Sequence, residues 1–296
     1  MAGGLAGQAI ELTQCVSHDL LVPAQAQIVV EGFVPTNIQE MEGPFGEFPG
    51  YMAARDYSWF MEVTAITMRK KPIYQAFLSQ FPPSESSKIR GIGWTAACFD
   101  YLKAAGFDCV QEVHFPETSG SFGVCLVRIR RQKDDDATRI LDYLSKKFVG
   151  KMAIVVDEDV DIHDPNAIYW ALSYAMQPHR DVRVVDIPLM ALDPSIAPPG
   201  ASRGLTGDKP RMSGLLIDAT RDWPYPPVSL PGKEFMEGAI ALWQDLGLPE
   251  LKLRKPWFGY NLGSWSADEE EEAALAARGD YYVTGQKQRG ERRKLD

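Results

Sequence analysis

The chain has 296 residues, of which 45% are hydrophobic and 24% are charged, a composition that is ordinary for a globular protein. Its formal net charge of −9 argues against non-specific binding to nucleic acid. Its apolar runs are too short to span a bilayer, and residues 1–7 (MAGGLAG) lack the basic flank and apolar core of a signal peptide. We therefore predict a cytoplasmic protein of two domains and a tail that binds neither nucleic acid nor membrane.

Short strands are predicted in the first 80 residues. Apolar and polar side chains alternate over residues 8–34, and the pattern resumes over residues 60–68 and 72–77 after a turn at residues 69–72. About six short strands are few for a self-sufficient barrel, so an unpaired sheet edge is expected here.

Two carboxylates lie in this strand region. Glu42 and Glu47 flank a Gly-Pro-Phe-Gly turn, in which Pro44 fixes its own φ and the glycines permit backbone conformations that other residues resist. Two acids held beside a ligand in unlike environments suit proton transfer, because burial and neighbouring charge separate their pKa values. The same residues are typical of a surface turn with two solvated acids, and the pattern alone favours that simpler interpretation.

Helices and strands alternate from residue 89 onward. Apolar residues at helical spacing predict a helix from Ile89 to Leu102 that ends at Gly106. Strands are predicted over residues 109–115, 123–130, 152–156, 182–187 and 214–218. A helix capped by residues 134–136 has an apolar side formed by Ile140, Leu141, Leu144 and Phe148. A second helix is opened by Asp164 and Pro165, and its predicted buried residues are Ile168, Leu172 and Ala175. This alternation predicts a partly parallel α/β sheet. No glycine-rich motif for a dinucleotide or a nucleoside triphosphate is present.

The remaining segments are less regular. Residues 188–212 are predicted to be a loop, and residues 233–246 a helix with Phe235, Ala239, Leu242 and Leu246 on one face. Ser266 and Glu269 form a capping-box signature for a further helix that runs to residue 278. Residues 286–296 are polar and basic, which indicates a mobile, solvated tail, with residues 281–283 (YYV) as a candidate anchor.

No metal site is indicated by the cysteines and histidines. The four cysteines include no CxxC pair, and Cys109 and Cys125 fall in apolar runs that predict buried thiols. The four histidines show no HxH or HxxxH spacing. Asp157, Asp159 and Asp161 alternate after a predicted strand in a pattern that resembles metal ligands, although such acidic runs are more often solvated.

Several ordered stretches resemble the UbiD family of prenylated-flavin-dependent decarboxylases, whose pattern reads VPAxAEIVLEG…EGPFGE…GY. The matching stretches are residues 22–32 (VPAQAQIVVEG), 42–51 (EGPFGEFPGY), 150–161 (GKMAIVVDEDVD), 170–172 (WAL), 177–181 (QPHRD) and 218–224 (DATRDWP). The resemblance runs over residues 2–225 and corresponds to the C-terminal part of such an enzyme.

This resemblance implies a fold of the α/β class, α+β overall, in which a partial split β-barrel segment is followed by a UbiD C-terminal-like α/β/α domain. Residues 1–80 would be the C-terminal half of a split-barrel flavin-binding domain, residues 81–230 an α/β oligomerisation domain, and residues 231–296 C-terminal helices and a mobile tail. The first half of the barrel, which in the family carries the metal ligands and a catalytic arginine, would be missing before Met1.

The resemblance also implies a chemistry. The family binds prenylated FMN, with Mn²⁺ and K⁺ bridging its phosphate to the protein, and decarboxylates or carboxylates aromatic and α,β-unsaturated acids. By match to the EGPFGE motif, Glu47 takes the position of the glutamic acid that delivers the proton. Glu42 takes the position of its partner glutamate, which forms an ionic network with an arginine from the N-terminal half.

Two basic residues, Lys151 and Arg55, are candidates for the cation of such a site. Lys151 takes the position of a lysine that reaches the flavin phosphate, although a lysine that shields the start of a strand is an equally good interpretation. Arg55 matches no catalytic position and is expected to form a salt bridge on a strand face. The catalytic arginine and the metal ligands are therefore expected from another chain, or they are absent.

These observations predict one subunit of a split UbiD-type carboxy-lyase that is active only with a partner chain. The partner would be an N-terminal-half UbiD-like subunit in a homo- or hetero-oligomer, and the substrates a small aromatic or unsaturated acid and CO₂. The alternative is a non-catalytic scaffold or oligomerisation subunit, against which the intact Glu42 and Glu47 argue, because a scaffold needs no paired acids. An artificially truncated chain is a third interpretation.

Overall fold

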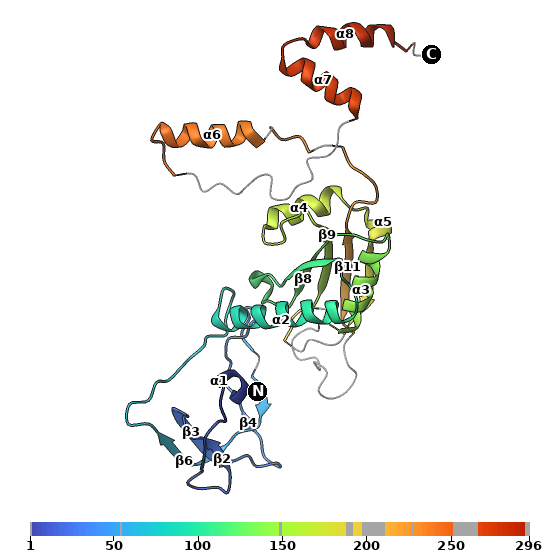
Figure 1. Cartoon of the computed structure of the whole chain (residues 1–296). Helices are drawn as coiled ribbons and strands as arrows, with labels where there is room; N and C mark the ends of the chain where they lie inside the picture. Colours follow the sequence, from blue (N-terminus) through green and yellow to red (C-terminus); the bar gives the residue numbers. More distant parts are fainter. Residues whose placement is uncertain are drawn as a thin grey trace. The chain divides into compact units, whose positions relative to one another are not determined.

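The computed structural model describes residues 2–53, 55–147, 150–187, 192–196, 211–226, 228–231, 233–250 and 266–293. The chain divides into two units, and the division falls inside helix α2 (Glu85–Ala104). The first unit comprises Met1–Trp94, Pro116–Phe122 and Leu189–Met212. The second unit comprises Thr95–Phe115, Gly123–Pro188 and Ser213–Asp296, and the elements of both are labelled in Figure 1.

The described part of the first unit contains three separate strand pairs. A short helix, α1 (Ala2–Ala6), precedes the hairpin formed by β1 (Leu12–Gln14) and β2 (Leu21–Pro23). The other antiparallel pairs are β3 (Ile28–Phe33) with β6 (Glu62–Met68), and β4 (Glu40–Met41) with β5 (Tyr57–Ser58). No closed barrel is present among the described residues, in agreement with the partial barrel segment that the sequence predicts.

The predicted strand over residues 72–77 is wrong. These residues are not assigned to any strand of the described chain. The Ile73 N–H donates to the side-chain Oε1 of Gln27 at 3.2 Å instead of to a backbone carbonyl of a neighbouring strand. Pro72 has no N–H to donate at all. An apolar, extended sequence becomes a strand only where a second strand lies beside it.

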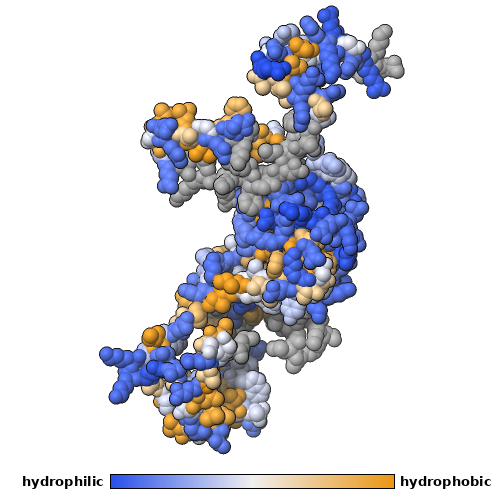
Figure 2. Space-filling model, in the orientation of Figure 1, coloured by the Kyte–Doolittle hydropathy of each residue, from blue (hydrophilic) through white to orange (hydrophobic). Residues whose placement is uncertain are grey.

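The first unit buries few of its apolar side chains. Among the described residues, its buried apolar side chains are Phe48, Pro82 and Met212. On one face of the β3–β6 pair, Val30 and Ile66 lie opposite each other and are 47% and 56% exposed, and Met68 on the same face is 59% exposed. Figure 2 shows hydrophobic atoms gathered over the part of the chain that contains β2, β3 and β6. Contiguous exposed apolar side chains of this kind mark an interaction surface.

Glu31 is a buried charge in this unit, with only 5% of its surface exposed. Its carboxylate accepts hydrogen bonds from the Val16 N–H at 3.0 Å and from the Ser17 N–H and hydroxyl, both at 2.7 Å. These hydrogen bonds lower the pKa of the Glu31 carboxyl, and the bond from the Val16 N–H has the largest effect. The interaction fixes the loop between β1 and β2 to strand β3.

A five-stranded sheet forms the centre of the second unit. Its strands are β7 (Val110–His114), β8 (Val124–Ile129), β9 (Met152–Asp157), β10 (Val182–Asp186) and β11 (Ser213–Ala219), in the order β10-β11-β9-β8-β7. The central strands β11, β9 and β8 are parallel, and the edge strands β10 and β7 pair antiparallel with their neighbours. The partly parallel α/β sheet expected from the sequence is confirmed.

Both faces of this sheet are covered. Helix α4 (Pro165–Tyr174) packs Ile168 and Ala171 against Ile154 and Val156 of β9. Outside this cluster, fully buried side chains come from the strands and from helix α3 (Asp136–Lys147), which contacts β9 and β11; they are Val127, Val155, Leu216, Ile140, Leu141 and Leu144. The predicted apolar residues of both helices are therefore buried, except that Leu172 is only partly buried and Phe148 lies outside the described residues.

The buried thiols predicted from the sequence are confirmed and extended. Cys109 and Cys125 are 3% and 0% exposed, and Cys98 of α2 is also fully buried. A hydrogen bond with Cys98, together with burial, raises the pKa of the Cys125 thiol well above its usual value. These thiols are therefore part of the apolar core.

Three further helices follow β11. They are α6 (Lys233–Asp245), α7 (Ala267–Ala277) and α8 (Tyr281–Gly290), and a short α5 (Pro178–Asp181) precedes β10. The capping box of Ser266 and Glu269 is confirmed at the start of α7. The predicted apolar face of α6 exists in sequence but is not buried, since Phe235 and Leu242 are 71% and 59% exposed. None of the helices in the described residues combines the length and the apolar character needed to cross a membrane.

Residues 281–290 form helix α8, so part of the tail predicted over residues 286–296 is helical. Local hydrogen bonds stabilise this helix start, with the Val283 N–H donating to the Asp280 carbonyl at 3.0 Å. The candidate anchor residues Tyr281 and Tyr282 are 70% and 58% exposed.

Candidate functional site

The two predicted catalytic acids lie in one hairpin-like loop, residues 42–51, which we call the acid loop. Its ends are joined by two hydrogen bonds, from the Glu42 N–H to the Asp56 carbonyl (2.9 Å) and from the Ala53 N–H to the Phe45 carbonyl (2.8 Å). At its tip the Glu47 carbonyl accepts from the Gly50 N–H at 2.9 Å. Glu42 is exposed, whereas Glu47 is half-buried. The fold therefore gives the two acids different environments.

The acid loop lies closely against residues 79–81. A Cβ atom added to Gly46 would come within 2.6 Å of the Ser79 carbonyl oxygen. A Cβ atom added to Gly50, whose φ is +93°, would come within 2.8 Å of the Phe81 ring. Gly46 and Gly50 are thus required by close approach, and Gly50 also by its left-handed backbone, whereas Gly43 has open space around it.

Phe48, the residue after Glu47, anchors the tip of the loop. It is 7% exposed, and its ring makes a T-shaped contact with Phe122 at a centroid distance of 6.4 Å. The Arg90 guanidinium stacks on the same ring, with its Cζ atom 3.6 Å from the ring centroid. Gly120 lies against Phe48 on another side, where an added Cβ would be 2.9 Å from the ring. The position of Glu47 is therefore set by packing of its neighbour.

Arg90 brings a positive charge to Glu47. Burial lowers the pKa of the Arg90 guanidinium, and the negative charge of Glu47 acts in the opposite direction. Arg90 lies in α2, in the same unit as the acid loop. Arg55, for which the sequence predicts a salt bridge on a strand face, is exposed and forms no ion pair within the described part of the chain.

The segment 116–122, which carries Gly120 and Phe122, is tied to the start of α2. Glu117 forms an ion pair with Lys88 at 2.7 Å and accepts a hydrogen bond from the Ser87 hydroxyl at 3.3 Å. The hydrogen bond with Lys88 is the main cause of a lowered pKa of the Glu117 carboxyl. Helix α2 and this segment together hold Phe48.

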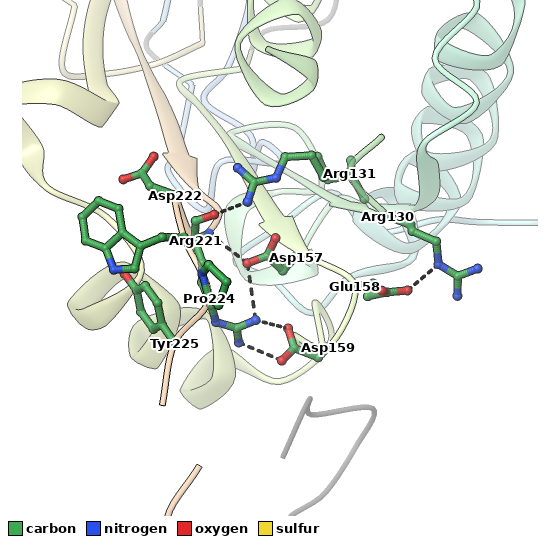
Figure 3. Close-up of a pocket in the computed structure, with 11 residues that line it drawn as sticks. Arg130, Arg131, Asp157, Glu158, Asp159, Arg221, Asp222, Pro224 and Tyr225 are labelled. Atoms are coloured by element: carbon green, nitrogen blue, oxygen red, sulfur yellow. Dashed lines mark hydrogen bonds and ion pairs between the residues drawn. The ribbon is translucent and has the colours of Figure 1, made fainter. Parts of the chain in front are cut away.

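The acidic run after β9 forms an ion network in the second unit, shown in Figure 3. Arg221 donates two hydrogen bonds to Asp159, at 3.0 and 2.7 Å, and its N–H donates to Asp157 Oδ2 at 2.9 Å. Asp159 is 1% exposed, and burial raises the pKa of the Asp157 carboxyl. The Asp161 carboxylate instead accepts from the His163 N–H at 2.9 Å. The alternating aspartates thus bind an arginine and a backbone N–H.

A cavity of about 400 Å³ adjoins this network, at the carboxyl ends of the parallel strands β8, β9 and β11. Its wall includes Trp223 and Tyr225. The arginines that line it are engaged with protein groups: Arg130 pairs with Glu158, and Arg131 donates to the Arg221 carbonyl. Among the described residues, no group of three or more His, Cys, Asp or Glu side chains is placed to hold a metal ion.

Two models of one family match the chain. Residues 1–82 match UbiD, the 3-octaprenyl-4-hydroxybenzoate carboxy-lyase Rift-related domain, and residues 89–219 match UbiD_C, the C-terminal domain of the same enzyme. Together they cover more than two thirds of the chain. The chain belongs to the UbiD family.

Solved structures agree with this UbiD fold. HmfF from Pelotomaculum thermopropionicum, an evolved dimeric UbiD-class enzyme in complex with prFMN, is 29% identical with a TM-score of 0.60, over 79% of this chain and 49% of that one. Vanillic acid decarboxylase (ShVdcCD) from Sedimentibacter hydroxybenzoicus, in open form with truncated ShVdcD, is 26% identical with a TM-score of 0.63, over 83% and 52%. The apo 3,4-dihydroxybenzoic acid decarboxylase AroY from Klebsiella pneumoniae is 26% identical with a TM-score of 0.61, over 80% and 52%.

The UbiD chain described here spans about half the length of these structures. Its three sequence-predicted site residues fall in both units: Glu42 and Glu47 in the first, Lys151 in the second. Lys151 directly precedes β9, and its backbone N–H donates to the Gly123 carbonyl at 2.8 Å. The structure brings the two acids together and leaves Lys151 in a different unit.

Sequence reasoning missed Arg90 and Phe48 in this UbiD chain. Phe48 lies inside the recognised motif region, but its burial depends on contacts with α2 and with segment 116–122. Arg90 is far from the motif in sequence and belongs to a helix whose predicted pattern concerns its apolar residues only. No local signal could have linked Arg90 to Glu47.

Proposed function

We propose that this chain is one subunit of a split UbiD-type carboxy-lyase. With a partner chain it catalyses the reversible decarboxylation of an aromatic or α,β-unsaturated acid. The observation that carries this proposal is the acid loop, whose two glutamates are intact and whose tip is held by a buried anchor, Phe48. A loop with no chemical role needs no such support. HmfF, a UbiD-class relative, was solved with prFMN, and two other relatives are decarboxylases of aromatic acids.

Glu47 is the proton donor of the proposed reaction. Its side chain is half-buried at the tip of the acid loop, and Glu47 Oε2 accepts a hydrogen bond from the Phe48 N–H at 3.3 Å. Glu42 is exposed at the start of the acid loop, where an arginine of the partner chain can pair with it. The loop presents one acid to the substrate and the other to the interface.

Prenylated FMN, when bound, supplies the electron-accepting group for cleavage or formation of the bond to CO₂. Lys151 is the residue of this chain proposed to bind its phosphate, for which an exposed ammonium group is chemically suited. The described residues offer no metal-binding cluster. The proposal therefore assigns the ligands of Mn²⁺ and K⁺ mainly to the partner chain.

The partner is proposed to be an N-terminal-half UbiD-like chain that covers the first unit. The exposed face of the β3–β6 pair, with Val30, Ile66 and Met68, offers apolar surface and free strand edges to such a chain. The relative ShVdcCD was itself solved with a second component, ShVdcD. A two-chain assembly is therefore consistent with the exposed surface.

The proposal is tested by purifying the chain from its own cells, followed by native mass spectrometry, an absorbance spectrum and turnover assays with a panel of aromatic and unsaturated acids. We expect a complex with a second chain and a bound flavin. In that complex Glu47→Gln lowers turnover by about 100-fold or more, because general acid catalysis contributes about 10²–10⁴-fold. The control Glu40→Gln changes an exposed glutamate just outside the acid loop and leaves turnover unchanged.

The second candidate function is a non-catalytic oligomerisation subunit. The exposed apolar residues of α6, Phe235 and Leu242, favour it, because they are suited to contacts between chains. In this case Glu47→Gln leaves turnover of the assembly unchanged while the assembly stays intact. A homo-oligomer without a second chain and without flavin in the mass spectrum would also contradict the proposal of a split enzyme.

A further inference from the structure

We propose that the cavity at the carboxyl ends of β8, β9 and β11 is a binding site for a small aromatic monocarboxylate, held by Arg131 and by the rings of Trp223 and Tyr225. We call it the strand-end cavity. All of its lining residues belong to the second unit, whereas Glu42 and Glu47 belong to the first. The site and its test are therefore independent of the proposed proton donor.

The topology of the sheet opens a crevice at this place. Strands β8 and β9 are adjacent and parallel, and the chain continues from β8 into α3 and from β9 into α4. Helix α4 packs into an apolar cluster on one face of the sheet, and the buried residues of α3 are not part of that cluster, because α3 covers the other face. The two connections thus leave neighbouring strand ends toward opposite faces. In α/β proteins, ligands bind in the crevice that such connections leave between them.

Three strand ends supply the lining of the strand-end cavity. Residues 129–131 come from the end of β8, residues 157–159 from the end of β9, and residues 221–225 follow β11; Figure 3 draws these side chains. The volume of about 400 Å³ falls in the usual range of small-molecule sites, about 300–1,000 Å³. Lys151, proposed to bind the flavin phosphate, precedes β9 and so lies at the opposite end of that strand. The two proposed sites share no residue.

Two aromatic rings form one wall of the cavity. The centroids of the Trp223 and Tyr225 rings are 6.3 Å apart. The Tyr225 hydroxyl donates to the Tyr174 carbonyl at 3.0 Å, and the Arg180 guanidinium lies over the Trp223 ring with its Cζ atom 5.7 Å from the centroid. These contacts hold both rings in place, yet Trp223 remains 58% exposed. A fixed, exposed indole offers apolar area on which a flat ring can stack.

Arg131 supplies a positive charge that no neighbouring carboxylate balances. It donates to the Arg221 carbonyl and forms no ion pair within the described part of the chain. A carbonyl accepts from one of the several N–H donors of a guanidinium and leaves its charge in place. Burial raises the pKa of the Asp157 and Asp218 carboxyls, and the charge of Arg131 opposes that rise from beyond ion-pair distance. Arg131 therefore has both donors and charge to offer to an anion.

The acids of the cavity limit the ligand to one negative charge. Four carboxylates also line it, those of Asp157, Glu158, Asp159 and Asp222. The first three are paired with the other lining arginines, Arg130 and Arg221, and the fourth is paired with Arg180. A single carboxylate on the ligand balances Arg131, whereas a phosphate or a dicarboxylate adds further negative charge beside these acids and is repelled.

The first experiment observes Trp223 directly. The full-length chain is labelled with 5-fluorotryptophan, and the Trp223 signal in the ¹⁹F spectrum is assigned by its absence from Trp223→Phe. Titration with 4-hydroxybenzoate should move this signal, with saturation between micromolar and millimolar concentration. The uncharged 4-hydroxybenzamide should bind about 10-fold more weakly or worse, and inorganic phosphate should leave the signal in place.

Variants then test the cation. Arg131→Gln should weaken the binding of 4-hydroxybenzoate about 10-fold or more, because it removes a charge-assisted hydrogen bond. The matched control Lys133→Gln removes the same charge two residues further along, where the side chain is exposed and does not line the cavity, and should bind the acid normally. Glu47→Gln should also bind normally, whether or not it loses turnover.

A second measurement needs no label. Because a ligand that binds the folded state stabilises it by mass action, 4-hydroxybenzoate should raise the urea midpoint of the wild-type chain, and should raise that of Arg131→Gln by less. A Trp223 signal that stays in place at millimolar 4-hydroxybenzoate overturns the inference, as does equal binding of the amide or of phosphate. If Arg131→Gln does not fold, the comparison of acid with amide on the wild-type chain still decides the role of the charge. Inactivity of Glu47→Gln without binding at Trp223 refutes this site alone and leaves the proposed enzyme standing.

Discussion

Phe48 shows how a single side chain fixes a catalytic loop. Its neighbours are Arg90, Phe122 and Gly120, which come from two other segments of the first unit. Gly120 has a φ of +66°, a left-handed conformation that residues with a Cβ adopt at a cost of about 1 kcal/mol or more. Space and backbone geometry at this position both require glycine.

Substitution of this glycine is therefore expected to be destabilising. In Gly120→Ala the new Cβ would lie 2.9 Å from Phe48 Cδ2 and 3.0 Å from the Phe48 carbonyl oxygen, so Phe48 must move. We expect a loss of about 1–3 kcal/mol of unfolding free energy, measured by urea denaturation followed by fluorescence.

The matched control is Gly93→Ala in α2. Gly93 has open space around it and helical neighbours, so alanine should stabilise the chain by about 0.5–1 kcal/mol. Equal effects of the two substitutions would show that the Phe48 contact has no part in stability.

At the scale of elements, ion pairs and a hydrogen bond join the carboxyl ends of three parallel strands. Arg221, just after β11, binds Asp157, the last residue of β9, and Asp159, which follows that strand. Arg131, just after β8, donates to the Arg221 carbonyl. Asp159 and Arg221 are mostly buried, with side chains 2% and 17% exposed. Breaking a buried ion pair of this kind lowers stability strongly, because the remaining charge is left buried without a partner or solvent.

We expect Asp159→Asn to lower the unfolding free energy of the chain by about 2–4 kcal/mol, since Arg221 keeps Asp157 at 3.5 Å as a weaker partner. The control is Glu158→Gln, which removes the neighbouring pair with Arg130. That pair is exposed, with side chains 69% and 47% accessible, so its loss should change stability by about 0.5 kcal/mol or less.

Denaturant unfolding of both variants at one pH measures the difference. A small effect of Asp159→Asn, equal to that of Glu158→Gln, would mean that the network at the strand ends contributes no more than a surface ion pair.

At the scale of the whole molecule, the two units differ in burial. The second unit encloses a continuous apolar core around β9, whereas the described part of the first unit buries few apolar side chains, namely Phe48, Pro82 and Met212. Strands with an uncovered apolar face contribute little stability by themselves, because hydrophobic stabilisation is proportional to the area removed from water. The first unit is accordingly expected to gain order from the proposed partner chain.

Substitution on the uncovered face tests this expectation. The double variant Val30→Thr/Ile66→Thr keeps β-branched residues but removes apolar surface from the β3–β6 pair. We expect partner binding to weaken about 10- to 100-fold in a titration calorimetry experiment, with the stability of the isolated chain nearly unchanged. The control Val184→Thr alters a 70% exposed strand residue of the second unit and should bind the partner normally. Unaltered affinity of the double variant would place the partner elsewhere.

Expectations from the sequence were correct where the determining contacts are local. Asp164 caps α4 by accepting from the Asn166 N–H at 2.9 Å, and Ser266 and Glu269 form their capping box within one turn. The strand predicted over residues 72–77 was wrong because strand formation depends on a distant neighbour. The tail helix α8 was missed because its polar sequence has no apolar periodicity to reveal it.

The sequence by itself determined the family, the order of helices and strands in the second unit, and the two acids of the EGPFGE motif, because motifs and side-chain periodicity are properties of neighbouring residues. Only the tertiary structure decided that Arg90 and Phe122 lie against Phe48, the residue next to Glu47. It also decided that Asp157 and Asp159 bind Arg221, and that one apolar face of the β3–β6 pair is exposed to solvent. These facts depend on which segments meet in space, and packing between distant residues leaves no pattern in any short stretch of sequence.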